Sequence, residues 1–199
     1  MDNQLPELAM NENYLDYPLC LNERIYSVVI REPVNRTISQ ETQLNHLKQI
    51  KKFDNDINAT LFNARLNLAR NNYMTWALAI GSSYGPVEDI HKLYTMPQPK
   101  LLEIAKQTLL QMDFIMDPVS QTDVCLQAKV SLMMDMDNNA SATLGHENSW
   151  GKRPKLHHYH NISREQYAAW NELDIELYRY ATSLIELDCL FYFTLDTLE

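Results

Sequence analysis

Apolar residues follow two different patterns along this chain. Residues 25–30, IYSVVI, form a short β-branched run that stops at a charged pair and a proline. A run of this length and composition predicts a strand buried in a parallel sheet rather than a helix. Residues 113–117, DFIMD, are a second candidate strand. We expect the two segments to pair in parallel, whereas an unrelated helical scaffold would contain no such pair.

Elsewhere, apolar side chains recur at spacings of three and four, which predicts amphipathic helices. Pro33 suits the first turn of a helix, where a missing N–H costs nothing. Ser163 and Gln166 have the spacing of a capping box and predict the start of the last helix. The predicted helices span residues 33–53, 59–78, 99–112, 121–134 and 163–187.

The last predicted helix has an apolar side and an acidic side. Asp174, Glu176 and Glu186 are expected on its solvated surface, because charged side chains on a helix are usually exposed. The positions expected to be buried are Ile175, Leu177, Tyr178, Ala181, Leu184 and Ile185.

This order of elements predicts a helix-rich α/β fold with few strands. The chain has 199 residues, which is enough for one domain with a sizeable core. We expect residues 1–23 to be irregular, because Pro6 and Pro18 interrupt them, and residues 24–199 to form the domain. A doubly wound sheet needs more than two strands. The parallel sheet is therefore expected to be incomplete or heavily covered by helices.

The chain is acidic, with 17 Lys and Arg against 26 Asp and Glu and a formal net charge of −9. Nucleic-acid binding needs clustered Lys and Arg, so this balance argues against a nucleic-acid partner for the chain as a whole. A few residues can still create a local site for a small anion. The polar N-terminus lacks the apolar region of a signal peptide, and no run approaches the ~18 apolar residues of a membrane span. The chain as written is expected to be soluble.

The chain has three cysteines, Cys20, Cys125 and Cys189, and an odd number this widely spaced indicates neither a disulfide framework nor a zinc motif. One bridge with one free thiol, and three buried thiols, are both compatible with this number. Three buried thiols are favoured, because Cys often behaves as a small core residue.

The strongest chemical signal is IREPVNRTIS at residues 30–39. Arg31 follows the first predicted strand, where open α/β sheets bind ligands, and its planar guanidinium suits a phosphate. Ser39 lies about six helical residues after Pro33, ~9 Å along the axis of the predicted helix, and could add a hydroxyl. The helix N-terminus beside them also favours an anion. From these residues alone, a salt-bridged Arg before a proline-started helix is the favoured interpretation, and a phosphate site is the alternative.

A family resemblance adds to this signal. Residues 31–39, REPVNRTIS, resemble the R-[DE]-P-x-x-R-x-x-S element of PAPS-dependent sulfotransferases. The likeness is closest to the Golgi carbohydrate type, the heparan sulfate 2-O and 6-O and galactose 3-O enzymes. Residues 72–78, NYMTWAL, resemble that family's N-Y-x-T-R-x-L stretch. Residues 161–163, NIS, and 171–178, NELDIELY, resemble its late N-x-S … N-x-x-D-x-x-L-Y pattern, so the resemblance covers residues 24–182.

The resemblance implies a fold, an activity and two binding residues. In that family the first Arg and the final Ser of the element bind the 3′-phosphate of PAPS, which assigns this role to Arg31 and Ser39. Arg36 is expected to pack or to form a salt bridge. The implied fold is that of a P-loop-kinase-like sulfotransferase. The implied activity is transfer of a sulfuryl group from PAPS to a carbohydrate hydroxyl in the Golgi lumen, without a metal.

Two departures from the family pattern leave a second hypothesis open. Trp76 stands where the family usually has Arg. The family's 5′-phosphosulfate loop, of K-x-x-x-T type, precedes the REP element, yet the 30 residues before Arg31 contain neither Lys nor Gly. The family's catalytic acid or base also lies in that part, so no catalytic residue is assigned. The alternative is a non-catalytic fragment or degenerate module that binds PAP or PAPS weakly or acts only in interactions.

The remaining candidates are less specific. Residues 152–160, KRPKLHHYH, could be a solvated loop, a basic flap over the nucleotide or an anionic sugar, or a metal site using His157, His158 and His160. Sequons at four positions fit a luminal protein, although the one inside the predicted nucleotide helix is a poor acceptor. They lie at Asn35, Asn58, Asn139 and Asn161.

Overall fold

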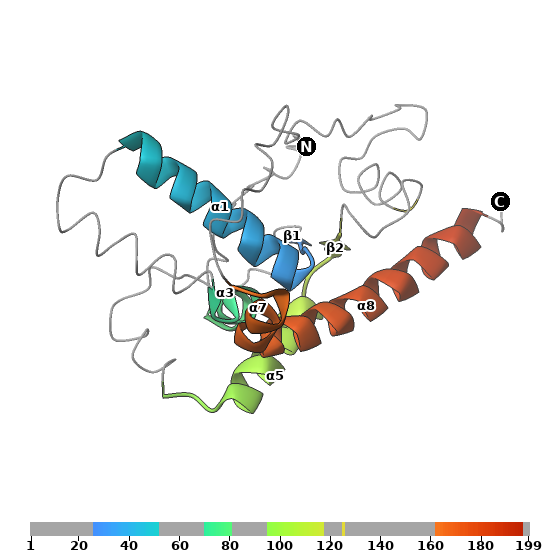
Figure 1. Ribbon diagram of the computed structural model, residues 1–199. Helices are drawn as coiled ribbons and strands as arrows, with labels where there is room; N and C mark the ends of the chain where they lie inside the picture. The colour runs from blue at the N-terminus through green and yellow to red at the C-terminus, as the bar shows by residue number, and fades with distance from the viewer. Residues whose placement is uncertain (1–25, 52–69, 81–94, 118–124, 126–161, 197–199) are drawn as a thin grey trace, which may run out of the picture.

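The computed structural model describes residues 26–51, 70–80, 95–117, 125 and 162–196. Helices α1 and α8 run outward in different directions from a centre formed by α3 and α7, with α5 beside them (Figure 1). The elements are β1 (Ser27–Val29), α1 (Pro33–Lys51), α3 (Tyr73–Ile80), α5 (Gln98–Leu109), β2 (Phe114–Met116), α7 (Arg164–Trp170) and α8 (Glu172–Asp196).

The two strands pair in parallel, as the sequence predicts. Ser27 is paired with Phe114 and Val29 with Met116. The ladder continues beyond β1, because the amide of Ile30 donates to the carbonyl of Met116 at 2.8 Å. The described part of the chain is therefore helix-rich α/β with a small parallel sheet, and it is not a purely helical scaffold.

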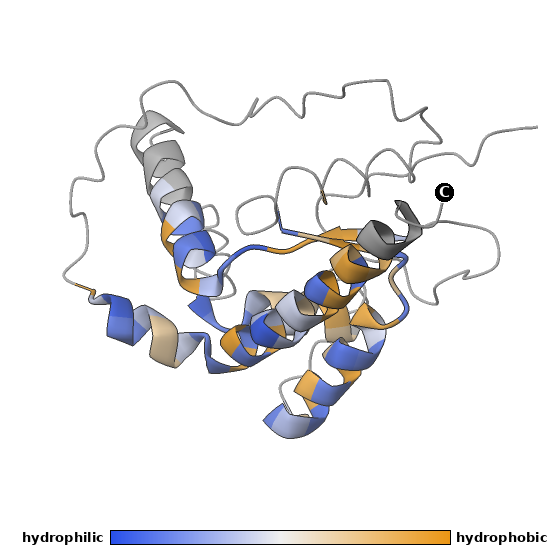
Figure 2. Cartoon of the chain, turned by 90° about the vertical axis from the view of Figure 1, so that its right-hand side faces the viewer, coloured by the Kyte–Doolittle hydropathy of each residue, from blue (hydrophilic) through white to orange (hydrophobic). Residues whose placement is uncertain are grey.

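The core lies between one face of this sheet and helices α3, α5 and α8. Ile30 and Ile115 from the sheet pack against Leu109 and Leu177, all of them at most 3% exposed. Each such aliphatic side chain contributes ~1.5–3 kcal/mol by leaving water. Figure 2 shows both strands as largely hydrophobic, next to helices on which polar and apolar residues alternate. The sheet and three helices therefore form one shared core.

The other face of β1 differs from the prediction. A strand buried on both faces was expected, but Ser27 and Val29 are exposed, Val29 by 53%. Side chains alternate across a strand, so Val28 and Ile30 point to the opposite face and pack on the core. Within the described residues, helices cover one face of the strand only.

The helix predicted over residues 59–78 is interrupted before α3. Asn72 has a φ of 51°, in the left-handed region. Asn tolerates this conformation better than most residues. Its Oδ1 accepts the amides of Leu173 at 2.9 Å and Asp174 at 3.2 Å, at the start of α8. This contact explains the break. To accept the two amides, the Asn72 side chain has to face α8, which is remote in sequence, and the left-handed backbone at Asn72 interrupts the helix there.

The last predicted helix is two helices. The capping box is confirmed: Ser163 Oγ accepts the Gln166 amide at 3.3 Å, and Gln166 Oε1 accepts the Ser163 amide at 3.0 Å. The chain then turns at Asn171, whose φ of −120° and ψ of 31° end α7. Its Nδ2 donates to the Tyr167 carbonyl at 2.8 Å. Helix α8 continues to Asp196, beyond the predicted end near residue 187.

Two other predicted helices are confirmed to within a few residues, as α1 and α5. The predicted helix at 121–134 falls outside the described residues except for Cys125, which is helical. The segments 1–23, 81–86 and 135–160 lie entirely outside them. In the part that the structure describes, no helix is both long and apolar enough to cross a membrane.

The preference for three buried thiols is wrong. Cys125 and Cys189 form a disulfide across a sequence separation of 64, with their Cα atoms 5.6 Å apart. Cys125 is 1% exposed, and Cys189 packs partly against the core near the end of α8. Cys20 lies outside the described residues. The bridge ties the segment after β2 to the last helix.

Candidate functional site

One of the two residues expected to hold a phosphate lies at the junction of β1 and α1, and the other lies within α1. Arg31 follows the strand and precedes the helix, and its side chain is exposed. Ser39 is exposed on α1, eight positions later. Neither side chain forms an ion pair or a side-chain hydrogen bond with another described residue. Both are therefore accessible to a ligand from solvent.

The first turn of α1 is already capped. Glu32 accepts the amide of Val34 at 3.2 Å and that of Asn35 at 2.7 Å through its two carboxylate oxygens. A carboxylate at this position complements the positive end of the helix dipole. Glu32 thus occupies the backbone amides that were expected to help bind an anion at the helix N-terminus. A phosphate at this junction would rely on side-chain donors.

Arg164 of α7 lies against the same turn. Its Nη1 donates to Asn35 Oδ1 at 2.9 Å, and its Nη2 lies 4.0 Å from Glu32 Oε2. The Arg164 side chain is 62% exposed. Sequence reasoning did not single it out. A cation is disfavoured in the first turn of a helix, yet Arg164 occupies the first position of α7. This unfavourable placement is a sequence signal that could have identified Arg164 as a candidate binding residue.

Behind this exposed surface, Arg36 is mostly buried and paired, as expected. Its Nη2 lies 3.4 Å from Asp174 Oδ2, with the two side chains 12% and 0% exposed. Its guanidinium also lies over the ring of Tyr73, 4.9 Å from the centroid. The prediction that Asp174 is a surface residue is wrong. Glu176, in contrast, is 57% exposed as predicted, and it pairs with Lys106.

Asp174 is held by the N-terminus of α3. Its carboxylate accepts the amides of Met74 at 2.9 Å and Thr75 at 2.7 Å, and the Thr75 hydroxyl at 2.8 Å. Burial raises the pKa of the Asp174 carboxyl, while Arg36 and these donors act in the opposite direction. Burial also lowers the pKa of Arg36, and Asp174 opposes that change. The pair is thus a desolvated charge centre with most of its hydrogen-bonding capacity satisfied.

A second contact joins α1 to the junction of α7 and α8. The Thr37 hydroxyl is 2.9 Å from the Pro33 carbonyl and 3.4 Å from Asn171 Oδ1, and both Thr37 and Asn171 are fully buried. With Asn72, this network brings together the segments 31–39, 72–78 and 171–178, which are remote in the sequence.

Glu41 anchors a neighbouring cluster between α1 and α7. It forms an ion pair with Arg70 and accepts the Tyr167 phenol at 2.8 Å. Burial, with the Glu41 carboxylate next to it, raises the pKa of Tyr167 to about 12. Arg70 also lies over the Trp170 ring, 5.3 Å from its centroid. Glu41 occupies one of the positions at three- and four-residue spacing that apolar residues otherwise fill along this helix. A carboxylate at such a position is a sequence signal that it is buried.

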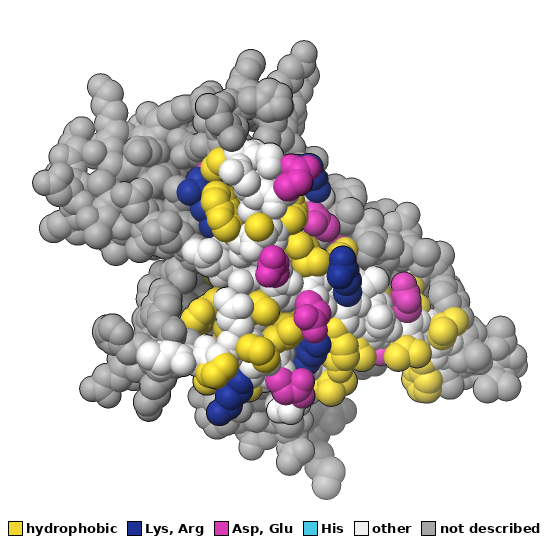
Figure 3. All heavy atoms as spheres, turned by 60° about the horizontal axis from the view of Figure 1, so that its bottom comes forward, with side chains coloured by type: hydrophobic (Ala, Val, Ile, Leu, Met, Phe, Trp, Pro, Cys, Tyr) yellow, Lys and Arg dark blue, Asp and Glu magenta, His cyan; other side chains and the backbone are white. Residues whose placement is uncertain are grey.

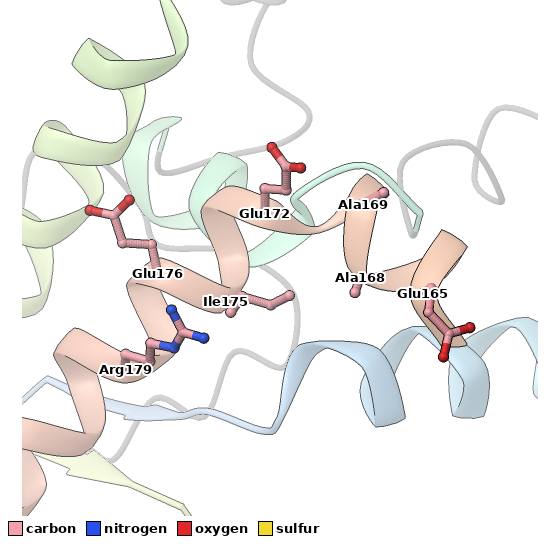
Figure 4. Close-up of a pocket in the computed structure, with 7 residues that line it drawn as sticks. All are labelled: Glu165, Ala168, Ala169, Glu172, Ile175, Glu176 and Arg179. Carbon is pink, nitrogen blue, oxygen red and sulfur yellow. The ribbon is translucent and has the colours of Figure 1, made fainter. Parts of the chain in front are cut away.

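Helices α7 and α8 share a shallow depression that suits an anion poorly. Figure 4 shows its labelled lining residues along the two helices. They include three carboxylates and one cation, namely Glu165, Glu172, Glu176 and Arg179. A phosphorylated ligand would meet net repulsion there. The depression is therefore not the expected nucleotide site.

Charge on the described surface is mixed. On the face shown in Figure 3, Lys and Arg side chains are interspersed with Asp and Glu. Among the described residues, no three His, Cys, Asp or Glu side chains come together as possible metal ligands. The three candidate histidines at 157–160 lie outside this part. An anion site here would be local, made by a few residues.

Comparison with known proteins adds no family to these observations. No protein-family model matches the chain, and no curated protein or solved structure matches it.

Proposed function

We propose that this chain is a PAPS-dependent carbohydrate sulfotransferase domain of P-loop-kinase-like fold, in which Arg31 and Ser39 hold the 3′-phosphate of the donor nucleotide. The observation that carries the proposal is the distribution of residues 31–39 between two environments. Arg31, Asn35 and Ser39 are exposed at four-residue spacing. Pro33 and Thr37, together with Val34, are buried. Three polar residues of the motif are thus available to a ligand from solvent, while the buried ones attach α1 to the core.

The convergence of the motif segments supports the same proposal. Three stretches that resemble one family in collinear order meet around Asp174, through Arg36 and Thr75. Arg31 lies two residues after the last residue of a parallel strand, at the end where α/β sheets bind ligands. A charge-assisted hydrogen bond from its guanidinium would contribute ~1.5–3 kcal/mol to phosphate binding.

The disulfide supports a luminal location. Disulfides persist in oxidising compartments and are rare in the cytosol. The Cys125–Cys189 bridge is therefore in keeping with a protein of the Golgi lumen. The proposed acceptor is a glycan hydroxyl, whose oxygen would take the sulfuryl group and leave PAP as the other product.

A second candidate function is nucleotide binding without transfer. Transfer needs a base for the hydroxyl proton and positive charge at the 5′-phosphosulfate. The one carboxylate next to Arg31 in sequence, Glu32, is occupied by the α1 amides. A transfer assay with PAPS and a glycan distinguishes the two functions, because the module would bind PAP yet release no sulfated product.

Calorimetric titration with PAP tests the proposal. The wild-type chain is expected to bind PAP, and Arg31→Ala is expected to weaken binding about tenfold or more, since ~1.4 kcal/mol corresponds to a factor of ten. Arg179→Ala is the matched control, because it removes an exposed cation from the acidic depression on α8. Equal PAP affinity in the wild type and Arg31→Ala would exclude the assignment.

A further inference from the structure

We propose that Arg164 is a third contact for the phosphate that Arg31 and Ser39 hold, so that two arginines from different elements flank the ligand. This inference rests on the proposed function and extends it to α7. It starts from the hydrogen bond between Arg164 Nη1 and Asn35 Oδ1, 2.9 Å long.

Asn35 places Arg164 on the correct side of α1. Residues four apart in a helix lie on the same face, so Asn35 and Ser39 are neighbours. Asn35 is also four positions after Arg31, and all three residues are exposed. Because Arg164 donates to Asn35, its guanidinium lies beside the first turn of α1, on the face that also carries Ser39, and Arg31 lies two residues before this helix begins.

The guanidinium of Arg164 has donors to spare. It carries five N–H groups in a planar fork. Among the described residues it donates one hydrogen bond to Asn35, approaches Glu32 to 4.0 Å and interacts electrostatically with the adjacent Glu165. The side chain is 62% exposed, so a ligand from solvent can reach the guanidinium. Such a fork is suited to phosphate oxygens.

Phosphate can displace Glu32 from Arg164 at little cost. An exposed ion pair of this kind contributes ~0–1 kcal/mol. Glu32 would keep its other partners, because the amides of Val34 and Asn35 continue to donate to it. The local structure does not require a cation here either. Ser163 and Gln166 already cap α7, and the helix dipole disfavours a positive charge at its first position.

The test compares two nucleotides that differ by the 3′-phosphate, PAP and AMP, in calorimetric titrations of the full chain. Arg164→Gln should weaken PAP binding about tenfold and leave AMP binding unchanged. Arg164→Lys should recover part of the loss, because it restores the charge without the fork. Arg179→Gln, which makes the same charge change on α8, should alter neither affinity. The thermal midpoint of Arg164→Gln should equal that of the wild type.

The outcomes separate the two proposals. If Arg31→Ala weakens PAP binding while Arg164→Gln does not, the role of Arg164 is wrong and the proposed function stands. The role is equally wrong if Arg164→Gln weakens PAP and AMP by the same factor, since the 3′-phosphate is then not involved. Absence of PAP binding by the wild-type chain would overturn both proposals.

Discussion

At the scale of residues, the same residue type takes opposite roles within one short motif. Arg31 is exposed, whereas Arg36 is mostly buried against Asp174. The family resemblance predicted this division, because it assigned phosphate binding to Arg31 and packing or a salt bridge to Arg36. The sequence pattern failed for Asp174, which looks like the neighbouring Glu176. Only the fold shows that Asp174 meets the amides of α3, a hundred residues away.

Removing the charge of Asp174 should be severely destabilising. Asp174→Asn leaves Arg36 buried without its anion, which costs ~3–5 kcal/mol, a large part of the stability of an ordinary domain. Glu176→Gln, two positions later, removes an exposed partner of Lys106 and should cost less than ~1 kcal/mol. Urea unfolding measures both variants. Similar midpoints for the two would show that the buried pair is not important for stability.

The Tyr167 phenol should make stability depend on alkaline pH. Its pKa is raised to about 12 in the folded chain, from an ordinary value of 10.0, so the neutral phenol is favoured on folding. This contribution is fully present below pH ~10 and is lost as the pH rises toward ~12. Tyr167→Phe should therefore be less stable than the wild type at pH 8, by ~1–2 kcal/mol.

The stability gap between Tyr167→Phe and the wild type should then close between pH 10 and 12. Unfolding midpoints measured across this range provide the readout. Tyr180→Phe on α8 is the control for general effects of alkali on the chain, because the Tyr180 ring contacts Lys106 rather than a carboxylate. A gap that stays constant with pH would contradict the role of the Tyr167–Glu41 hydrogen bond.

At the scale of elements, the sequence predicted where helices begin better than where they break. Pro33 and the Ser163–Gln166 box act within one turn, so local chemistry reveals them. The breaks at Asn72 and Asn171 depend on contacts between distant segments. A helical periodicity continues through both positions, which explains why single helices were predicted there. Each of these asparagines uses its side chain to connect two elements.

Two substitutions separate the roles of Asn72. Asn72→Gly keeps the left-handed backbone accessible but removes the acceptor for the amides of Leu173 and Asp174, at a cost of ~1–3 kcal/mol. Asn72→Ala loses the acceptor and adds ~1–2 kcal/mol for the positive φ. Urea unfolding should rank the wild type above Gly and Gly above Ala. A glycine variant as stable as the wild type would show that the acceptor contributes nothing.

At the scale of the whole molecule, periodicity correctly predicted a helix-rich α/β chain with a parallel strand pair. It did not predict that the described helices would cover only one face of β1, because alternation within a three-residue strand is too short to reveal a half-exposed face. The disulfide was also beyond prediction, since cysteine spacing cannot specify pairing. The candidate phosphate residues were found by resemblance, and the fold added Arg164 beside them.

The disulfide should contribute substantially to stability. Bridging residues 64 apart in sequence restricts the unfolded chain by about 4 kcal/mol in the chain-entropy model. Cys189→Ala should lower the free energy of unfolding by an amount of this order. Alkylation of the unreduced, denatured wild type should modify one cysteine, Cys20, because the structure pairs the other two. Modification of all three would contradict the bridge.

The central claim is that the junction of β1 and α1 holds the 3′-phosphate of a nucleotide. It is tested most directly by titrating the ¹⁵N-labelled chain with PAP and following its assigned backbone amides by NMR. The account predicts the largest saturable shifts at residues 31–39 and at Arg164, with AMP producing much smaller ones. Shifts confined to the acidic depression of α7 and α8, or none with PAP in excess, would contradict it.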